Sequence, residues 1–234
     1  MQKKDTPAGL NTREVKRVLN LVRKEAGLDR RNDKISEYFI GRPYIRNPLG
    51  GGPDEPEVFR ASLAAFDCVT YLESVLALAR SRTVDQFLDT LRLIRYDRGE
   101  IAWTRRNHYM VDWIRCNRRA GFIENLTRGK HAVRKERSLS IVPGLPKKSA
   151  SFLCYPKQKI GEVRERIKTG DLILFASARK WLDVFHAGLL VVPDSELLLR
   201  HATRSAGAVV EQPLASFLGS NRMSGFILLR PVER

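Results

Sequence analysis

The sequence has few of the features that would assign it to a class at once. Its 234 residues include only three cysteines, at positions 68, 116 and 154, and none of them is in C-x-x-C spacing. This number and spacing exclude a zinc framework and a disulfide scaffold. A pair between Cys116 and Cys154 stays open for an oxidising compartment, and at least one thiol is then unpaired.

Long apolar runs are also absent. No stretch approaches the roughly 18 apolar residues of a membrane span, and the first ten residues, MQKKDTPAGL, lack the apolar segment of a signal peptide. We therefore expect no membrane span. The chain is then either a protein that stays inside the cell or a mature form whose leader has been removed.

Acidic residues are few relative to basic ones. There are 26 Asp and Glu against 42 Lys and Arg, for a formal net charge of +16, and the segment 105–137 holds ten basic and three acidic residues. Such a chain should associate with an anionic partner, such as nucleic acid, acidic lipid head groups or an acidic cell-wall polymer. A solvated surface without a partner is the alternative.

The remaining pattern predicts an α+β domain. Apolar spacing predicts helices over 11–26, 68–80, 83–94 and 108–119, then strands over 172–176, 184–192, 196–203 and 226–229, with a short helix over 214–218. Glycine and proline make 40–60 irregular, and no Gly-Lys-Ser/Thr follows the triple glycine there, so it is not a phosphate loop. Helices first and strands later favour α+β over alternating βαβ units.

The predicted helix over 68–80 begins with a cysteine. Its apolar residues surround nearly the whole cylinder, so it should be buried on most sides, and Asp67 is a good N-cap. A helix N-terminus lowers the pKa of a thiol, which would make Cys68 a nucleophile. Cysteine is also among the most often buried residue types, so a plain core thiol is the alternative.

Two of the four histidines lie in neighbouring predicted strands. If Pro193 and Asp194 alone form the connecting loop, His186 and His201 are directly opposite each other on one face. A four-residue loop would place His201 opposite Gly188 and keep the same face. A shift of one residue would put the two imidazoles on opposite faces.

A thiol and two imidazoles are the parts of a cysteine hydrolase. Cys68 would attack, one histidine would take its proton, and the other would orient the first. The backbone N–H of Cys68 could help hold the oxyanion. No metal and no cofactor is expected.

Several segments occur in an order that resembles a known family: IGRPY (40–44), the glycine and proline loop, FDCVTYLE (66–73), RRNHYMVDW (105–113), GDLILF (170–175), HAGLL (186–190) and LLRHAT (198–203). From about residue 35 onward, the chain resembles the NlpC-type, papain-like cysteine peptidases of bacterial cell walls. It resembles their N-acetylmuramoyl-L-alanine amidase-like branch more closely. The resemblance implies a papain-like α+β fold, in which N-terminal helices, including a buried central helix, pack on a C-terminal antiparallel sheet.

The resemblance also implies the roles of individual residues. Cys68 would be the nucleophile, His186 the base and His201 the residue that orients the base. The expected substrate contacts are Tyr44, Asp67, Arg105, His108 and Tyr109. An alternative for His108 is a cap on the helix over 108–119. The family's Trp-Gly-Gly after the tyrosine is missing, and IRNPLGGGP stands there instead, so the substrate loop should differ.

The implied activity is hydrolysis of an amide in peptidoglycan or muropeptides. The bond is either the muramoyl–L-alanine bond or one within the stem, such as D-glutamyl–diaminopimelate. We expect one catalytic domain over 1–234, with a helical extension over 1–34 and a basic insertion over 95–150, acting as a monomer. A periplasmic or secreted location with the leader removed fits this activity best, and a cytoplasmic location stays open.

Two alternatives differ in substrate or in class. The same fold could serve a secreted toxin-like amidase or a lipid-directed acyltransferase. The chain could also be a basic nucleic-acid-binding domain without catalytic activity. The sequence has no zinc spacing, helix-turn-helix signal or basic-aromatic RNA motif, so we expect no nucleic-acid partner.

Overall fold

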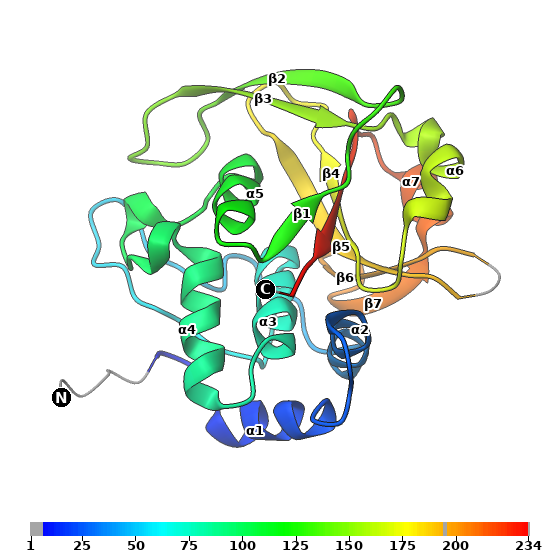
Figure 1. The fold of residues 1–234 in the computed structure, drawn as a ribbon. Coiled ribbons are helices and arrows are strands. Elements are labelled where there is room, and N and C mark those ends of the chain that lie inside the picture. The colour runs from blue at the N-terminus through cyan, green and yellow to red at the C-terminus, as the bar shows by residue number, and fades with distance from the viewer. Residues whose placement is uncertain (1–6, 194–195, 234) are drawn as a thin grey trace.

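The computed structural model describes residues 7–193 and 196–233 (Figure 1). The helices are α1 (Thr12–Leu21), α2 (Leu28–Tyr38), α3 (Cys68–Ala79), α4 (Val84–Arg95), α5 (Met110–Arg119), α6 (Ile160–Val163) and α7 (Leu214–Ser220). The strands are β1 (Ile123–Asn125), β2 (Val133–Leu139), β3 (Lys148–Cys154), β4 (Leu172–Ala176), β5 (Val184–Val191), β6 (Leu198–Thr203), β7 (Ala208–Pro213) and β8 (Gly225–Pro231). Short 3-10 turns lie at η1 (Asp97–Gly99), η2 (Trp103–Arg105), η3 (Lys157–Lys159) and η4 (Arg164–Arg166).

The strands form one large antiparallel sheet and a separate hairpin. The sheet has six strands in the order β1-β8-β4-β5-β6-β7, and β2 pairs with β3. Figure 1 shows the β2–β3 hairpin at the top, above α5, with α1 at the opposite end. The prediction of helices combined with an antiparallel sheet is confirmed.

The predicted helices are found where local signals support them. Asn11 caps α1 by accepting the Glu14 N–H at 3.1 Å, and Thr83 caps α4 through Gln86. Helix α1 ends at Leu21, earlier than predicted. The apolar pattern did not predict α2, β1, β2, β3 or β7, because these elements are largely polar or short.

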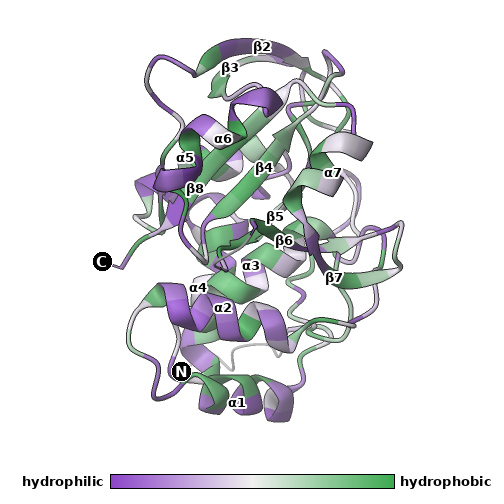
Figure 2. Cartoon of the chain, turned by 90° about the vertical axis from the view of Figure 1, so that its right-hand side faces the viewer, coloured by the Kyte–Doolittle hydropathy of each residue, from purple (hydrophilic) through white to green (hydrophobic). Residues whose placement is uncertain are grey.

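Helix α3 lies at the centre of the core. Every residue from Thr70 to Ala79 is buried, as the all-round apolar pattern predicted. Each fully buried Leu or Val contributes roughly 1.5–3 kcal/mol, so the position of this helix is held firmly. Strand β4 is buried along its whole length and is hydrophobic throughout in Figure 2.

Strands β5 and β6 form the hairpin that carries the two histidines, in a register that corrects one prediction. Leu189 pairs with Arg200 and Val191 with Leu198, so the loop is longer than two residues and the directly opposed arrangement is wrong. His201 lies opposite Gly188, as the longer-loop alternative predicted, and the two imidazoles stay on one face. Asp194, the second residue of the expected turn, lies outside the described residues.

Gly188 is required at this position by the packing of β6. A Cβ there would lie 2.6 Å from Leu199 Cδ1 and 3.0 Å from His201 Cβ. The absence of a side chain at Gly188 therefore sets how closely the His201 backbone approaches β5.

In the described chain, no helix is both long and apolar enough to cross a membrane.

Candidate active site

The N-terminus of α3 is fixed by a capping box. The Asp67 carboxylate accepts the N–H groups of Val69 at 3.1 Å and Thr70 at 2.8 Å, and the Thr70 hydroxyl accepts the Asp67 N–H at 3.0 Å. The predicted N-cap is confirmed. The Asp67 side chain faces the helix, and its expected contact with substrate stays a prediction.

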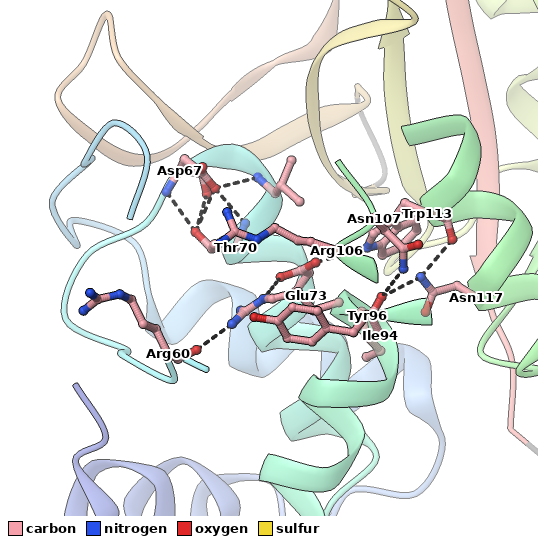
Figure 3. A network of polar contacts seen from close by, with 12 residues as sticks. Arg60, Asp67, Thr70, Glu73, Ile94, Tyr96, Arg106, Asn107, Trp113 and Asn117 are labelled. Atoms are coloured by element: carbon pink, nitrogen blue, oxygen red, sulfur yellow. Dashed lines mark hydrogen bonds and ion pairs between the residues drawn. The ribbon is translucent and has the colours of Figure 1, made fainter. Parts of the chain in front are cut away.

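A buried ion pair supports the same helix one turn further on. Arg95 Nε donates to Glu73 Oε2 at 2.7 Å, and both side chains are 3% exposed. The indole N–H of Trp113 contacts the other carboxylate oxygen at 3.3 Å. Figure 3 shows this network linking α3 with residues of α4 and α5. Glu73 thus ties α3 to its neighbours, which gives the final residue of FDCVTYLE a structural role.

The two histidines of the β5–β6 hairpin are in direct contact. His186 Nε2 lies 2.5 Å from His201 Nδ1, with the rings edge to face at 79°. One proton lies between the two nitrogens, so each ring fixes the tautomer of the other. The predicted juxtaposition of the two imidazoles is therefore observed.

Aromatic rings enclose this histidine pair. Phe217 on α7 stacks on His186 and meets His201 edge to face, each at 5.3 Å between ring centroids, and Phe175 on β4 lies nearly parallel to His186. Burial lowers the pKa of His186 to about 3, with a further contribution from the neighbouring ring, and it lowers the pKa of His201 to about 4. Both imidazoles are neutral at physiological pH.

The Cys68 thiol lies beside the same strand. The backbone N–H groups of Ala187, the residue after His186, and of Cys68 and Val69 lie close enough to the sulfur to act on the pKa of the thiol. Between the thiol and the His186 ring, no hydrogen bond is present in the described part of the chain. Such contacts are often loose before substrate binds.

The protonation state of the thiol corrects a second prediction. The helix N-terminus was expected to lower the pKa of Cys68. Desolvation, followed by the nearby Asp67 carboxylate, instead raises the pKa of this thiol to about 12, and the surrounding N–H groups oppose that shift only in part. Cys68 is partly exposed as a residue. The thiol and both imidazoles are thus neutral, and attack by Cys68 would require a base that removes the thiol proton.

The tautomers of His186 and His201 depend on which ring nitrogen accepts the thiol proton. If His186 Nδ1 were to act as a base, its proton would lie on Nε2, which would then donate to His201 Nδ1. The Nε2 atom of His201 is buried and lacks a hydrogen-bond partner in the described residues. The Cys68 backbone N–H donates to no carbonyl or carboxylate of the described chain, so it stays available for an oxyanion.

Tyr44 lies near Cys68. Its backbone N–H donates to Gly207 at 2.7 Å. Burial raises the pKa of Tyr44, and Cys68 and Asp67 raise it further because they are close enough to interact electrostatically. Arg204 and Arg46 oppose this shift, so two exposed guanidinium groups flank the same tyrosine.

The other expected substrate contacts gather elsewhere. Arg105, His108 and Tyr109 line a cavity of about 200 Å³ to which Cys68 and the two catalytic histidine candidates do not contribute. His108 Nε2 contacts the Trp103 carbonyl at 2.7 Å and does not cap α5, which begins at Met110 without a side-chain cap. The Tyr109 hydroxyl accepts the Ile141 N–H at 2.9 Å. These contacts are structural, and substrate binding by these residues stays a prediction.

Several features of the site were not found from the sequence. Phe175 and Phe217 appeared only as apolar positions of a strand and a helix, and no signal marks an aromatic residue as the wall of an imidazole pair. Arg46 and Arg204 lie in loops far apart in the sequence.

Cys116 and Cys154 are both free and buried, and no group of three or more potential metal ligands occurs in the described residues.

Comparisons with known proteins identify a family and solved structures of the same fold. The AmiA-like family model, described as N-acetylmuramoyl-L-alanine amidase-like, matches residues 34–226. An N-acetylmuramoyl-L-alanine amidase from Bacteroides uniformis is 27% identical, with a TM-score of 0.78 over 88% of this chain and 99% of that one. A Legionella pneumophila protein of the DUF1460 family shares the fold at 20% identity, with a TM-score of 0.83 over 95% and 94% of the two chains. No curated protein matches significantly.

Proposed function

Because the chain belongs to the AmiA-like family of N-acetylmuramoyl-L-alanine amidase-like proteins, we propose that it hydrolyses an amide of peptidoglycan or muropeptides through Cys68. The contact of 2.5 Å between His186 Nε2 and His201 Nδ1 carries this proposal, together with the closeness of the Cys68 thiol to the backbone N–H of Ala187, the residue after His186. Cys68, His186 and His201 would then serve as the nucleophile, base and orienting group of a papain-like, NlpC-type hydrolase.

The proposed reaction begins with attack by Cys68 Sγ on the amide carbonyl carbon. His186 Nδ1 takes the thiol proton as the C–S bond forms, and the Nε2–H of the resulting imidazolium donates to His201 Nδ1. The Cys68 backbone N–H donates to the oxyanion. His186 then gives the proton to the departing amine, the C–N bond breaks, and a thioester remains.

Water completes the cycle. His186 removes a proton from the water as it attacks the thioester carbonyl. The C–S bond then breaks, the sulfur regains the proton, and the carboxylic acid product leaves. A neutral imidazole is needed for both attacks, which agrees with the low pKa of His186.

The muramoyl–L-alanine bond is the preferred substrate in this proposal, since the family description and the Bacteroides relative both name that amidase class. The stem peptide released by this cut carries several carboxylates. Arg46 and Arg204, near Tyr44, would bind such groups. We place the enzyme in the periplasm or outside the cell, where this polymer lies.

The test is mass spectrometry of products from a defined disaccharide tetrapeptide. Wild-type protein should release a free tetrapeptide and the intact disaccharide, while Cys68→Ala should release neither. Cys116→Ala is the matched control, because it removes another thiol and should keep activity. Products cut within the stem would replace the amidase assignment with an endopeptidase, and equal activity in Cys68→Ala would disprove the cysteine mechanism.

A further inference from the structure

A large basic groove lies apart from the proposed catalytic centre. It has a volume of about 830 Å³ and is bounded by α5, β1, β8 and the β2–β3 hairpin. Its lining includes five arginines, namely Arg115, Arg118, Arg119, Arg128 and Arg134, and only one carboxylate, Glu124, among the described residues. The proposed reaction uses none of these arginines.

The fold separates this groove from the catalytic residues. Cys68, His186 and His201 do not line it. Strand β1 is three strand spacings from β5 in the sheet, about 14 Å. A ligand in the groove therefore occupies a second site on the same sheet.

Part of the groove's positive charge is not neutralised by the protein. Arg115 pairs with Asp112 at 3.0 Å, and Arg119 pairs with Asp97. Arg134 donates to the Ser151 hydroxyl at 2.9 Å. Arg118 and Arg128 are exposed and form no ion pair within the described residues. Like charges held this close repel one another, and an anionic ligand would relieve that repulsion.

The chemistry of the lining favours carboxylates on a peptide or glycan over nucleic acid. Guanidinium groups bind carboxylates in a planar, bidentate fashion. Binding of single-stranded nucleic acid relies on aromatic rings that stack with bases. Phe152 is the aromatic residue among the described lining residues, and Arg137 already lies over its ring at 5.8 Å.

We propose that this arginine groove binds stem-peptide carboxylates of polymeric peptidoglycan at a site remote from the scissile bond. This inference rests on the proposed function for its substrate class. It gives the basic segment 105–137 a role: the groove holds the enzyme on the polymer while the catalytic centre acts on a neighbouring stem.

The experiment measures binding of the Cys68→Ala protein to insoluble peptidoglycan freed of protein and of phosphate polymers. In this background, Arg118→Gln combined with Arg128→Gln should weaken binding about tenfold. Arg13→Gln combined with Lys16→Gln on α1 is the matched control, since it removes the same charge from an exposed surface outside the groove. The control should bind within about twofold of the parent, and thermal melting checks that both variants are folded.

The second measurement uses peptidoglycan whose carboxylates have been converted to amides. Amidated polymer should bind the parent as weakly as native polymer binds the groove variant. Equal losses in the groove and control variants, or undiminished binding to amidated polymer, would overturn the proposal. Tighter, groove-dependent binding to single-stranded DNA would also overturn it. These measurements need no turnover, so their failure is distinct from failure of the product analysis.

Discussion

At the scale of single residues, the proposed proton transfer depends on two imidazoles in contact, of which His186 is partly buried and His201 is buried. In the proposed reaction, His201 acts through His186 by holding that ring in one tautomer and one orientation. Its neighbours Phe175 and Phe217 keep water away and favour the neutral rings. This arrangement makes His201 a positioning residue.

Replacing His201 tests that role. His201→Ala should lower kcat by about 10²–10⁴ with little change in KM, because the imidazole of His186 loses its acceptor. His201→Asn should recover part of this loss, since its side-chain oxygen can take the place of Nδ1. Steady-state kinetics of both variants on a soluble muropeptide make the comparison. Equal activity of the two variants would contradict the positioning role.

The lowered histidine pKa values predict a pH dependence. A neutral base is required, so kcat/KM should persist down to about pH 5 and fall only as pH approaches the His186 value of about 3. A fall in kcat/KM centred near about pH 6.5, the ordinary pKa of histidine, would contradict a neutral pair of imidazoles at higher pH.

The free energy of unfolding should depend on pH through the same two histidines. Histidines of the unfolded chain bind protons at higher pH than the buried pair does. The free energy of unfolding should therefore be fully present above about pH 6.5 and decline as pH falls toward 4. Urea unfolding across this range measures the effect, and the His201→Asn protein should show a shallower slope.

At the scale of elements, the hairpin geometry depends on a missing side chain. Gly188→Ala would place a Cβ 2.6 Å from Leu199 Cδ1 and 2.9 Å from the Arg200 carbonyl, so β6 must shift. We expect a loss of about 1–3 kcal/mol in stability from the crowding and a fall in kcat of about tenfold or more as His201 moves.

Gly161→Ala is the matched control for this substitution. Gly161 lies in α6, and an added Cβ there would meet no atom within 4 Å. The control should keep wild-type melting and turnover. A Gly188→Ala protein that matched it in both measurements would show that the close approach of the strands does not set the histidine contact.

The position of α3 depends on a buried ion pair between Glu73 and Arg95. Glu73→Ala leaves the Arg95 guanidinium buried without its carboxylate, and we expect a loss of about 3–5 kcal/mol in the free energy of unfolding. Lys34→Ala removes the exposed partner of Glu25 and should cost about 1 kcal/mol or less. Chemical denaturation compares the two, and similar losses would contradict the role of the buried pair.

At the scale of the whole molecule, local patterns account for much of the fold. Apolar spacing and caps predicted α1, α3, α4 and the buried strands, because those signals lie within each element. Pairing between distant strands left no such signal. Strands β1 and β7 were missed, and the β5–β6 register needed the loop length, which the turn residues Pro193 and Asp194 did not fix.

Some features of the candidate site could likewise be predicted from the sequence, and others could not. Cys68 at a helix start and two histidines on one face could be read from spacing, and ordered motifs pointed to their roles. The pKa of Cys68 could not be predicted, since desolvation depends on what packs around the thiol and outweighs the helix dipole. The arginine groove is likewise assembled from α5, β1 and the β2–β3 hairpin only in three dimensions.

The number of free thiols in the chain can also be tested. Cys68, Cys116 and Cys154 are all free. Titration of the denatured, unreduced protein should therefore find three thiols per chain. A count of one would instead support the disulfide between Cys116 and Cys154 that the sequence left open.

The most direct test of the central claim is intact-protein mass spectrometry of acid-quenched reactions. Mixing wild-type protein with a defined disaccharide peptide should give an adduct on Cys68 with the mass of the muramoyl-containing disaccharide acyl group, and none in Cys68→Ala. Peptide mapping should place the adduct on the tryptic fragment that contains Cys68. Turnover by the Cys68→Ala protein, or an acyl group on any other residue, would contradict nucleophilic catalysis by this thiol.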